Sequence, residues 1–180
     1  MPDSRITKQA LANSLKDLMG GRPFEKITVS DIAAGCGMNR KSFYYHFRDK
    51  YELVDWIFLH DFNALFRDRP KGGVMDFFRV LCGYFYENRS FYHKALAIKG
   101  QNSFSNCIHD KIQPIVLEFF RSLLSEEDDY EFLSGFYTDA MIAALVRWLN
   151  TEPLMEPERL LTLMDRSLNG LANGHLAPEA

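Results

Sequence analysis

Residues 28–57 read TVSDIAAGCGMNRKSFYYHFRDKYELVDWI, and this stretch decides the fold. Thr28 and Asp31 have the spacing of a capping box, in which the hydroxyl accepts a hydrogen bond from a backbone N–H at a helix start and the acid reaches back. A short helix over residues 29–34 is therefore predicted, followed by a tight turn of small residues at 35–37. Asn39 can then cap a second helix over residues 40–47. This order is that of a helix-turn-helix motif.

The second helix of the motif has an apolar side and a polar side. At 3.6 residues per turn Phe43 and Phe47 share one face, where they can pack against Ile32 and the first helix of the chain. Adjacent cations at the start of such a helix suit guanine edges or phosphates, and tyrosine or histidine side chains are good phosphate donors. The remaining positions are Arg40, Lys41, Ser42, Tyr44, Tyr45 and His46. On an isolated helix the alternative would be a solvated face with half-buried tyrosines.

Charge is unevenly divided along the chain. Residues 1–50 contain nine Lys or Arg and five Asp or Glu, so this segment carries +4, whereas the whole chain of 180 residues carries −3. The remainder of the chain therefore carries −7. A basic head on an acidic body is typical of a small anion-binding domain joined to a second part, and nucleic acid is the usual large anion.

Composition excludes several classes of protein. Apolar residues make up 47% of the chain and aromatic residues 14%, which is too apolar for a disordered chain. The sequence has neither a run of about 18 uncharged apolar residues nor a signal peptide, so we expect no membrane partner. The three cysteines, Cys36, Cys82 and Cys107, have no paired spacing and favour a reducing, cytoplasmic location. Cys36 is interpreted as a small side chain that fits the turn, with redox sensing as the alternative.

Helical periodicity continues through the rest of the chain, interrupted by turn signals such as Gly20-Gly21 and Pro70–Gly73. The sequence predicts an all-α fold, with Asn169-Gly170 ending the last helix. About nine helices are expected, over residues 5–19, 29–34, 40–47, 50–67, 74–88, 91–98, 103–124, 128–150 and 157–168. We expect an N-terminal helix-turn-helix DNA-binding domain over residues 1–50 and a C-terminal helical domain over 51–180, with the helix over 50–67 connecting the two.

The run Ser42-Phe43-Tyr44-Tyr45-His46-Phe47, followed by Lys50, is close to the most specific signature of TetR/AcrR-type transcriptional regulators. Residues 5–60 resemble their DNA-binding domain, and the rest of the chain resembles them in size and helix order. Within this family, residues 39–47 with Tyr51 and Trp56 look most similar to the subgroup linked to dihydroxyacetone kinase operons. Met38 departs from the pattern, because a smaller branched residue is usual there.

The resemblance implies a TetR-like fold and a homodimer that places two recognition helices on the half-sites of a near-palindrome in double-stranded DNA. It implies phosphate contacts from some side chains and base contacts from others. Phosphate contacts are carried over to Thr28, Tyr44, His46 and Lys50, and base or near-base contacts to Arg40, Lys41, Ser42 and Tyr45. With the cap residue added, the predicted DNA-binding residues are Thr28, Asn39, Arg40, Lys41, Ser42, Tyr44, Tyr45, His46 and Lys50.

The resemblance also implies that the last two helices form a four-helix dimer interface and that the middle helices enclose a ligand pocket. The predicted dimer-interface residues are Phe132, Phe136, Met141, Leu145, Trp148, Leu160, Leu161, Met164 and Leu168; the alternative is that they form the core of one subunit. The middle of the chain is rich in aromatic residues, for which ordinary core packing is the alternative to a pocket. The candidate pocket residues are Tyr84, Tyr92 and His93, whose side chains carry polar groups. The histidine spacings predict no metal site, and no nucleotide-binding or nucleophile motif indicates a cofactor or an enzyme.

We therefore expect a homodimeric, sequence-specific DNA-binding transcriptional regulator, most simply a repressor that a small-molecule ligand releases from a palindromic operator. The alternative is a co-regulator or activator subunit whose C-terminal domain docks another protein. A discrete enclosed cavity with polar groups inside would favour the ligand. A solid aromatic core with an exposed apolar patch would favour the protein partner.

Overall fold

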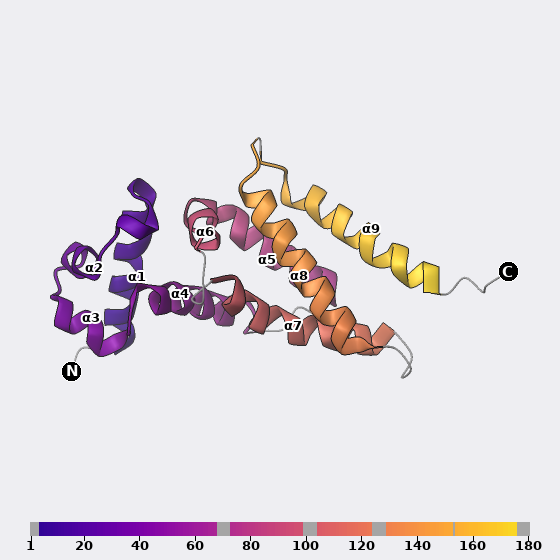
Figure 1. Ribbon diagram of the computed structural model, residues 1–180, viewed down its shortest axis with the longest axis horizontal. Coiled ribbons are helices and arrows are strands. Elements are labelled where there is room, and N and C mark those ends of the chain that lie inside the picture. Colours follow the sequence, from indigo (N-terminus) through magenta and orange to yellow (C-terminus); the bar gives the residue numbers. More distant parts are fainter. Residues whose placement is uncertain (1–3, 68–72, 99–103, 124–128, 153, 176–180) are drawn as a thin grey trace. The chain divides into compact units, whose positions relative to one another are not determined.

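The structure is a computed structural model that describes residues 4–67, 73–98, 104–123, 129–152 and 154–175. Over these ranges the chain forms nine α-helices, one 3-10 helix (η1) and no strand, which confirms the predicted all-α fold (Figure 1). The elements are α1 (Ser4–Gly21), η1 (Phe24–Lys26), α2 (Val29–Gly35), α3 (Arg40–His46), α4 (Lys50–Leu65), α5 (Val74–Glu87), α6 (Arg89–Leu96), α7 (Phe104–Leu123), α8 (Tyr130–Leu149) and α9 (Pro157–His175). No described helix is both long and apolar enough to cross a membrane.

By packing, the chain divides into two compact units. One contains the described residues within 1–68 and 90–104, and the other those within 69–89 and 105–180. We call them the head unit and the bundle unit. This division groups α4 and most of α6 with the head unit. The functional division at residue 50 that the sequence suggests stays a prediction.

The head unit has a single apolar core beneath the helix-turn-helix. Helix α2 packs against α1 and α3, and α4 packs against α1. Phe43 and Phe47, the two aromatic residues predicted to face inward, are 0% and 2% exposed. Other side chains of this core are Leu11, Leu15, Met19, Phe24, Ile27, Ile32, Leu53, Val54 and Ile57. Burial of these side chains fixes α3 by its inner face and leaves its outer face free for contacts.

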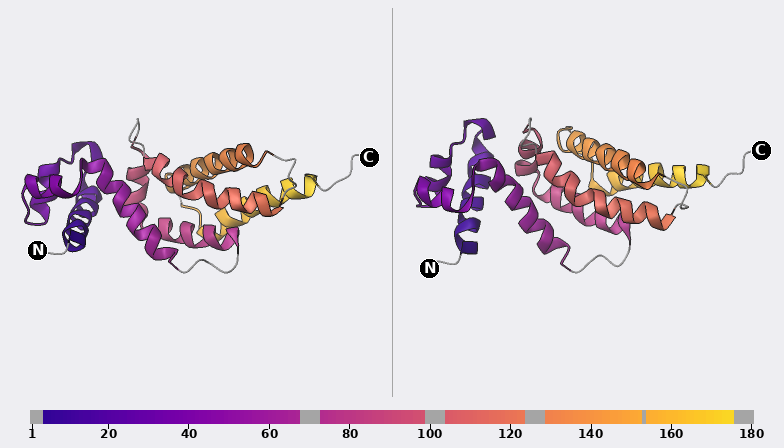
Figure 2. Two further views of the ribbon diagram at one scale, coloured as in Figure 1. Left: turned by 90° about the horizontal axis from the view of Figure 1, so that it is seen from below. Right: turned by 60° about the horizontal axis from the view of Figure 1, so that its bottom comes forward.

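In the bundle unit α5 packs against both α9 and α8, and Figure 2 shows α5 beside α9 from two further directions. Helix α7 continues through Pro114. The predicted end of the last helix at Asn169-Gly170 is wrong, because α9 runs to His175. One glycine costs a helix only about 1 kcal/mol, so it does not by itself stop one.

The predicted dimer-interface residues fall into two groups. Leu145, Trp148, Leu160 and Leu161 are at most 8% exposed within one chain and have almost no surface left for a partner. Met141 and Met164 are half-buried, and the side chain of Leu168 lies outside the described ones. Phe132 and Phe136 instead stack on each other at 6.2 Å and are 65% and 57% exposed. Among the described residues, these two large apolar side chains leave this part of α8 exposed to water.

Candidate nucleic-acid interface

Helix α2 begins with the predicted capping box. The Thr28 hydroxyl accepts from the Asp31 N–H at 3.1 Å, while the Asp31 carboxylate accepts from the Thr28 N–H at 2.9 Å and from the Thr28 hydroxyl at 2.8 Å. These bonds, from the backbone first and then from the hydroxyl, hold the pKa of Asp31 below its usual value, and Arg22 at 3.7 Å adds to the effect. The Thr28 hydroxyl thus donates within the chain, and its contact with a phosphate stays a prediction.

The turn between α2 and α3 depends on two glycines. Gly37 has a φ of +70°, a left-handed conformation that glycine adopts without strain. Gly35 lies against α1, where a Cβ would come within 2.3 Å of the Ser14 hydroxyl. That hydroxyl donates to the Ile32 carbonyl at 2.7 Å, so α1 holds the end of α2. Between the glycines, burial raises the pKa of the Cys36 thiol, which supports its interpretation as a small structural residue.

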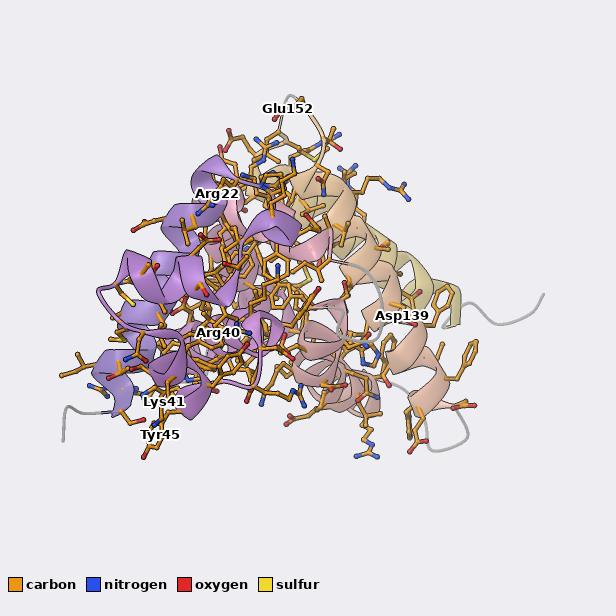
Figure 3. All side chains as sticks on the ribbon, turned by 60° about the vertical axis from the view of Figure 1, so that its left-hand side comes forward. Arg22, Arg40, Lys41, Tyr45, Asp139 and Glu152 are labelled. Carbon is orange, nitrogen blue, oxygen red and sulfur yellow. The ribbon has the colours of Figure 1, made fainter. Side chains whose placement is uncertain are left out.

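Helix α3 presents a basic and aromatic outer face. Its N-cap is Asn39, whose side chain accepts from the Ser42 N–H at 2.9 Å, as predicted. Arg40 and Lys41 are exposed on the first turn of the helix, and Figure 3 shows both on α3 together with the projecting Tyr45, which is 81% exposed. We call the exposed set of Arg40, Lys41, Tyr44 and Tyr45 the recognition face.

Two members of the recognition face contact each other. A guanidinium N–H of Arg40 donates to the Tyr44 hydroxyl at 3.1 Å, and the guanidinium carbon lies 5.3 Å from the centre of the Tyr44 ring. His46, on the last turn of α3, is half-buried with its ring 4.9 Å from that of Tyr45. Burial, and secondarily the charge of Lys8, lowers the pKa of His46. Both effects favour the neutral form of the imidazole.

Lys50 is engaged inside the chain, which the sequence did not predict. Its ammonium donates to the carbonyls of Phe24 at 2.7 Å, Ile27 at 2.8 Å and Glu25 at 3.3 Å. It also lies 4.3 Å from the centre of the Phe24 ring. Burial lowers the pKa of Lys50, an effect that Glu25 opposes. The ammonium therefore ties η1 to the first turn of α4, and a phosphate contact from Lys50 stays a prediction.

Two cations near α3 were not among the predicted DNA-binding residues. Lys8, on α1, lies 5.4 Å from the centre of the Phe47 ring. Arg48 lies two residues after the end of α3 with a largely exposed side chain, and its guanidinium is 3.3 Å from the Asp49 carboxylate. Lys8 is separated from α3 by more than thirty residues, so no local pattern could have placed it there. Arg48 lies within residues 28–57, and its positive charge was the only feature of the sequence that pointed to a role in DNA binding.

The bundle unit has an open groove and a small cavity. The groove, of about 460 Å³, is open to solvent and is lined by Ser105, Asn106, His109, Asp139, Ile142, Ala143, Val146 and Arg147. The cavity, of about 20 Å³, has room for about one water and is lined by Phe78, Leu81, Cys82, Ile112, Met141, Ile142, Leu145, Leu160 and Met164. Tyr84, Tyr92 and His93 line neither space. Tyr92 is instead fully buried in the head unit, where it stacks on Phe104 at 5.8 Å.

The described residues contain no group of three or more His, Cys, Asp or Glu side chains placed to hold a metal ion. Chemically, the helix-turn-helix offers hydrogen-bond donors and positive charge on a helix short enough to enter a groove. The part of the chain beneath it is an apolar, buried core. This combination suits the binding of a polyanion.

Two matches to known families cover most of the chain. Residues 14–57 match the bacterial regulatory proteins of the tetR family, and residues 74–170 match a transcriptional regulator C-terminal region of the same family. The chain belongs to the TetR family. The predicted family resemblance is thereby confirmed, and the recognition face of this TetR-family regulator lies on the helix that the family signature marks.

Individual relatives agree with the predicted subgroup. The TetR-family chain is 36% identical over 99 residues to the HTH-type dhaKLM operon transcriptional activator DhaS of Lactococcus lactis subsp. lactis (strain IL1403). That match covers 54% of this chain and 53% of the relative, so the chain matches only about half of the relative's length.

Solved structures share the fold over nearly the whole chain. A structure of the dihydroxyacetone kinase operon activator DhaS aligns with a TM-score of 0.70 at 24% identity, covering 94% of this chain and 97% of that one. A TetR transcriptional regulator from Streptococcus agalactiae 2603V aligns with a TM-score of 0.71 at 22% identity, covering 89% and 92%. At these identities the structures establish the TetR-like fold.

Proposed function

We propose that this TetR-family protein is a homodimer that binds a two-fold symmetric operator in the cytoplasm and controls transcription from it. The recognition face carries this proposal. Arg40, Lys41, Tyr44 and Tyr45 all lie on the solvent side of a helix whose inner side is fixed by the buried Phe43. Cations at the start of a recognition helix suit guanine edges, and exposed tyrosines beside them suit phosphates.

The proposal predicts a selectable binding site. Purified protein should enrich a two-fold symmetric sequence from a random library of duplex DNA at about 0.15 M salt, where non-specific binding is weak. The half-sites should be centred about 34 Å apart or at a multiple of that distance. Enrichment of an asymmetric site, or of none, would contradict a homodimer that reads DNA by itself.

Phe132 and Phe136 support the dimeric part of the proposal. Because they are exposed, polar replacement should leave the fold of one chain intact and weaken only its association. The double variant Phe132→Ser, Phe136→Ser should raise the dimer dissociation constant at least about tenfold in sedimentation equilibrium. Val80→Ser on α5, where the valine is 37% exposed, is the matched control. Equal dissociation constants for the double variant and the control would remove this part of α8 from the interface.

The cavity and the groove of the bundle unit bear on whether a ligand or a protein partner regulates this chain. A ligand-controlled repressor is the commoner expectation, yet the small cavity holds only about 20 Å³ and its lining is apolar. The groove is large enough for a metabolite but open. Together with the relation to an operon activator, this favours regulation through a docked protein as the second candidate function.

A screen of the selected duplex separates the two modes. Release of the DNA by a small metabolite at micromolar concentration would support the ligand-controlled repressor. Stable ternary complexes of DNA, this chain and a second protein, with transcription raised in a reconstituted assay, would support the activator. Direct repression by the protein alone, unaffected by any added protein, would contradict the activator.

A further inference from the structure

The apolar face that α1 turns toward the core of the head unit begins with a lysine. Leu15 and Leu11 are fully buried on this face, and Lys8 lies about one turn before Leu11 on the same side of the helix. The Lys8 ammonium is 5.4 Å from the centre of the Phe47 ring, which is 2% exposed. An apolar side chain could cover the same ring, so packing alone does not require a cation at this position.

Within the part of the chain that the structure describes, Lys8 forms no ion pair with a carboxylate. The next lysine along α1 differs, because the Lys16 ammonium pairs with the Asp61 carboxylate on α4 at 3.1 Å. Arg48, the residue after Phe47, also has an acidic partner, the Asp49 carboxylate at 3.3 Å. The charge of Lys8 is therefore available to an anion from outside the chain.

His46 places a second hydrogen-bond donor at the same end of α3. It is the last residue of that helix and directly precedes Phe47, whose ring Lys8 covers. The charge of Lys8 acts on the imidazole and, after burial, is the second cause that lowers the pKa of His46. Within the described residues the imidazole contacts the Tyr45 ring and forms no hydrogen bond. A phosphate between the two side chains would accept a hydrogen bond from each and offset the unfavourable effect of the ammonium on the imidazole.

We infer that Lys8 on α1 and His46 on α3 bind one and the same backbone phosphate of the DNA. The inference rests on the proposed function and extends the DNA-binding surface from the helix-turn-helix to the first helix of the chain. Helices α1 and α3 pack against each other, so a phosphate held by both fixes the position of α3 on the duplex (Figure 1). Phosphate contacts set register and orientation and carry no sequence information themselves. Lys8 therefore contributes affinity, and the recognition face contributes sequence preference.

The salt dependence of binding tests the contact of Lys8 with DNA. The affinity of the full-length protein for the selected duplex is measured over a range of salt concentrations at pH 8, above the ordinary imidazole pKa of about 6.5. Lys8→Met should lower the slope of log K against log salt by about 0.9 per subunit, or about 1.8 for a dimer on two half-sites. It should weaken binding to the selected and a scrambled duplex by the same factor. Lys8→Arg, which keeps the charge, should retain the slope.

Neutral methylphosphonate linkages test whether the two side chains share a phosphate. They are introduced one position at a time, at equivalent places in both half-sites of the selected duplex. One position should weaken binding of the unaltered protein about tenfold or more, the lower end for hydrogen bonds to charged groups. Lys8→Met and His46→Gln should each reduce this penalty at least about twofold at that position, the smallest coupling usual for groups in contact, and leave other positions unchanged. Lys111→Met, at an exposed position on α7, is the matched control and should behave like the unaltered protein.

An unchanged salt slope in Lys8→Met would overturn the inference even if affinity fell, because Lys8 would then act only by covering Phe47. Reduced penalties at two different linkages would overturn it as well, since the side chains would then contact separate phosphates. If Lys8→Met loses helical circular dichroism, acetyl-lysine in place of Lys8 decides, because it keeps the aliphatic stem and removes the charge. If no duplex binds the unaltered protein, the proposed function fails first; if DNA binding is intact and the slope unchanged, only this inference fails.

Discussion

The guanidinium of Arg40 is held by Tyr44 one turn further along the same helix, through a hydrogen bond of 3.1 Å to the hydroxyl and a stacking distance of 5.3 Å to the ring. The two residues are four apart, the spacing at which side chains on a helix meet. A guanidinium has five N–H donors, so the bond to Tyr44 leaves others for a base edge. Tyr44 therefore orients Arg40 before DNA arrives, which lowers the entropy lost on binding.

Arg40→Ala should reduce sequence discrimination more than it reduces DNA binding as such. One bidentate contact to a base contributes about 1–3 kcal/mol of discrimination. We expect the affinity for the selected site to fall by a corresponding factor of about 5–150, with a much smaller effect on a scrambled duplex. Tyr44→Phe, which removes the orienting hydroxyl, should give a smaller loss in the same direction. Fluorescence anisotropy titrations measure both, with Arg121→Ala on α7 as control. Equal losses of affinity for both duplexes would mean that Arg40 contacts phosphates and not bases.

Lys50→Met should destabilise the fold whether or not DNA is present. The variant leaves the carbonyls of Phe24, Glu25 and Ile27 without their shared donor. Hydrogen bonds to a charged group contribute about 1.5–3 kcal/mol, and we expect a loss of that size in the free energy of unfolding. Urea denaturation followed by circular dichroism measures it, with Lys26→Met, an exposed lysine of η1, as control. Unchanged stability together with weaker DNA binding would instead mean that Lys50 acts on phosphates alone.

Asp31 should make the stability of the head unit fall in acid. Its pKa is lowered in the folded chain by hydrogen bonds from Thr28, so its contribution is complete above the unfolded pKa and is lost as the pH falls through the lower folded pKa. Asp31→Asn should therefore be less stable at pH 7 and show a shallower loss between pH 5 and pH 3. Thermal unfolding at several pH values tests this, against Asp17→Asn, an exposed site on α1. Parallel curves for the two variants would contradict it.

Gly35→Ala should destabilise the protein through Ser14. The added methyl group would lie 2.3 Å from the Ser14 hydroxyl and displace it from the Ile32 carbonyl. Overpacking of this kind costs about 1–3 kcal/mol. In a Ser14→Ala background the same change should cost at least about 1 kcal/mol less, because the two sites are in contact. Gly20→Ala, where a Cβ meets nothing within 4 Å, is the control. Additive costs would show that the clash is relieved elsewhere.

Local patterns predicted the parts of the fold that depend on near neighbours. The capping box at Thr28, the cap at Asn39 and the inward faces of Phe43 and Phe47 all follow from spacings of three or four residues, and the structure contains each of them. The direction of the recognition face follows in turn, because burying one side of a short helix exposes the other.

Contacts between distant segments could not be predicted in this way. Lys50 reads as a free cation in the sequence, yet its partners are main-chain carbonyls more than twenty residues earlier, and a carbonyl leaves no trace in the residue type. The apolar spacing on α8 likewise could not separate Leu145, which one chain buries, from Phe136, which it does not. Both residues fit the same helical period, and the positions of the neighbouring helices α5, α7 and α9 decide between them.

The separation of the two sides of α3 has a consequence for how this regulator can evolve. Arg40, Lys41 and Tyr45 all lie on the solvent side, so the hydrophobic core places no restriction on what replaces them. A duplicated gene could acquire a new set of target promoters by substitutions at these positions, each tolerated by the fold as it arises. The same freedom makes them the natural sites for retargeting the protein by design.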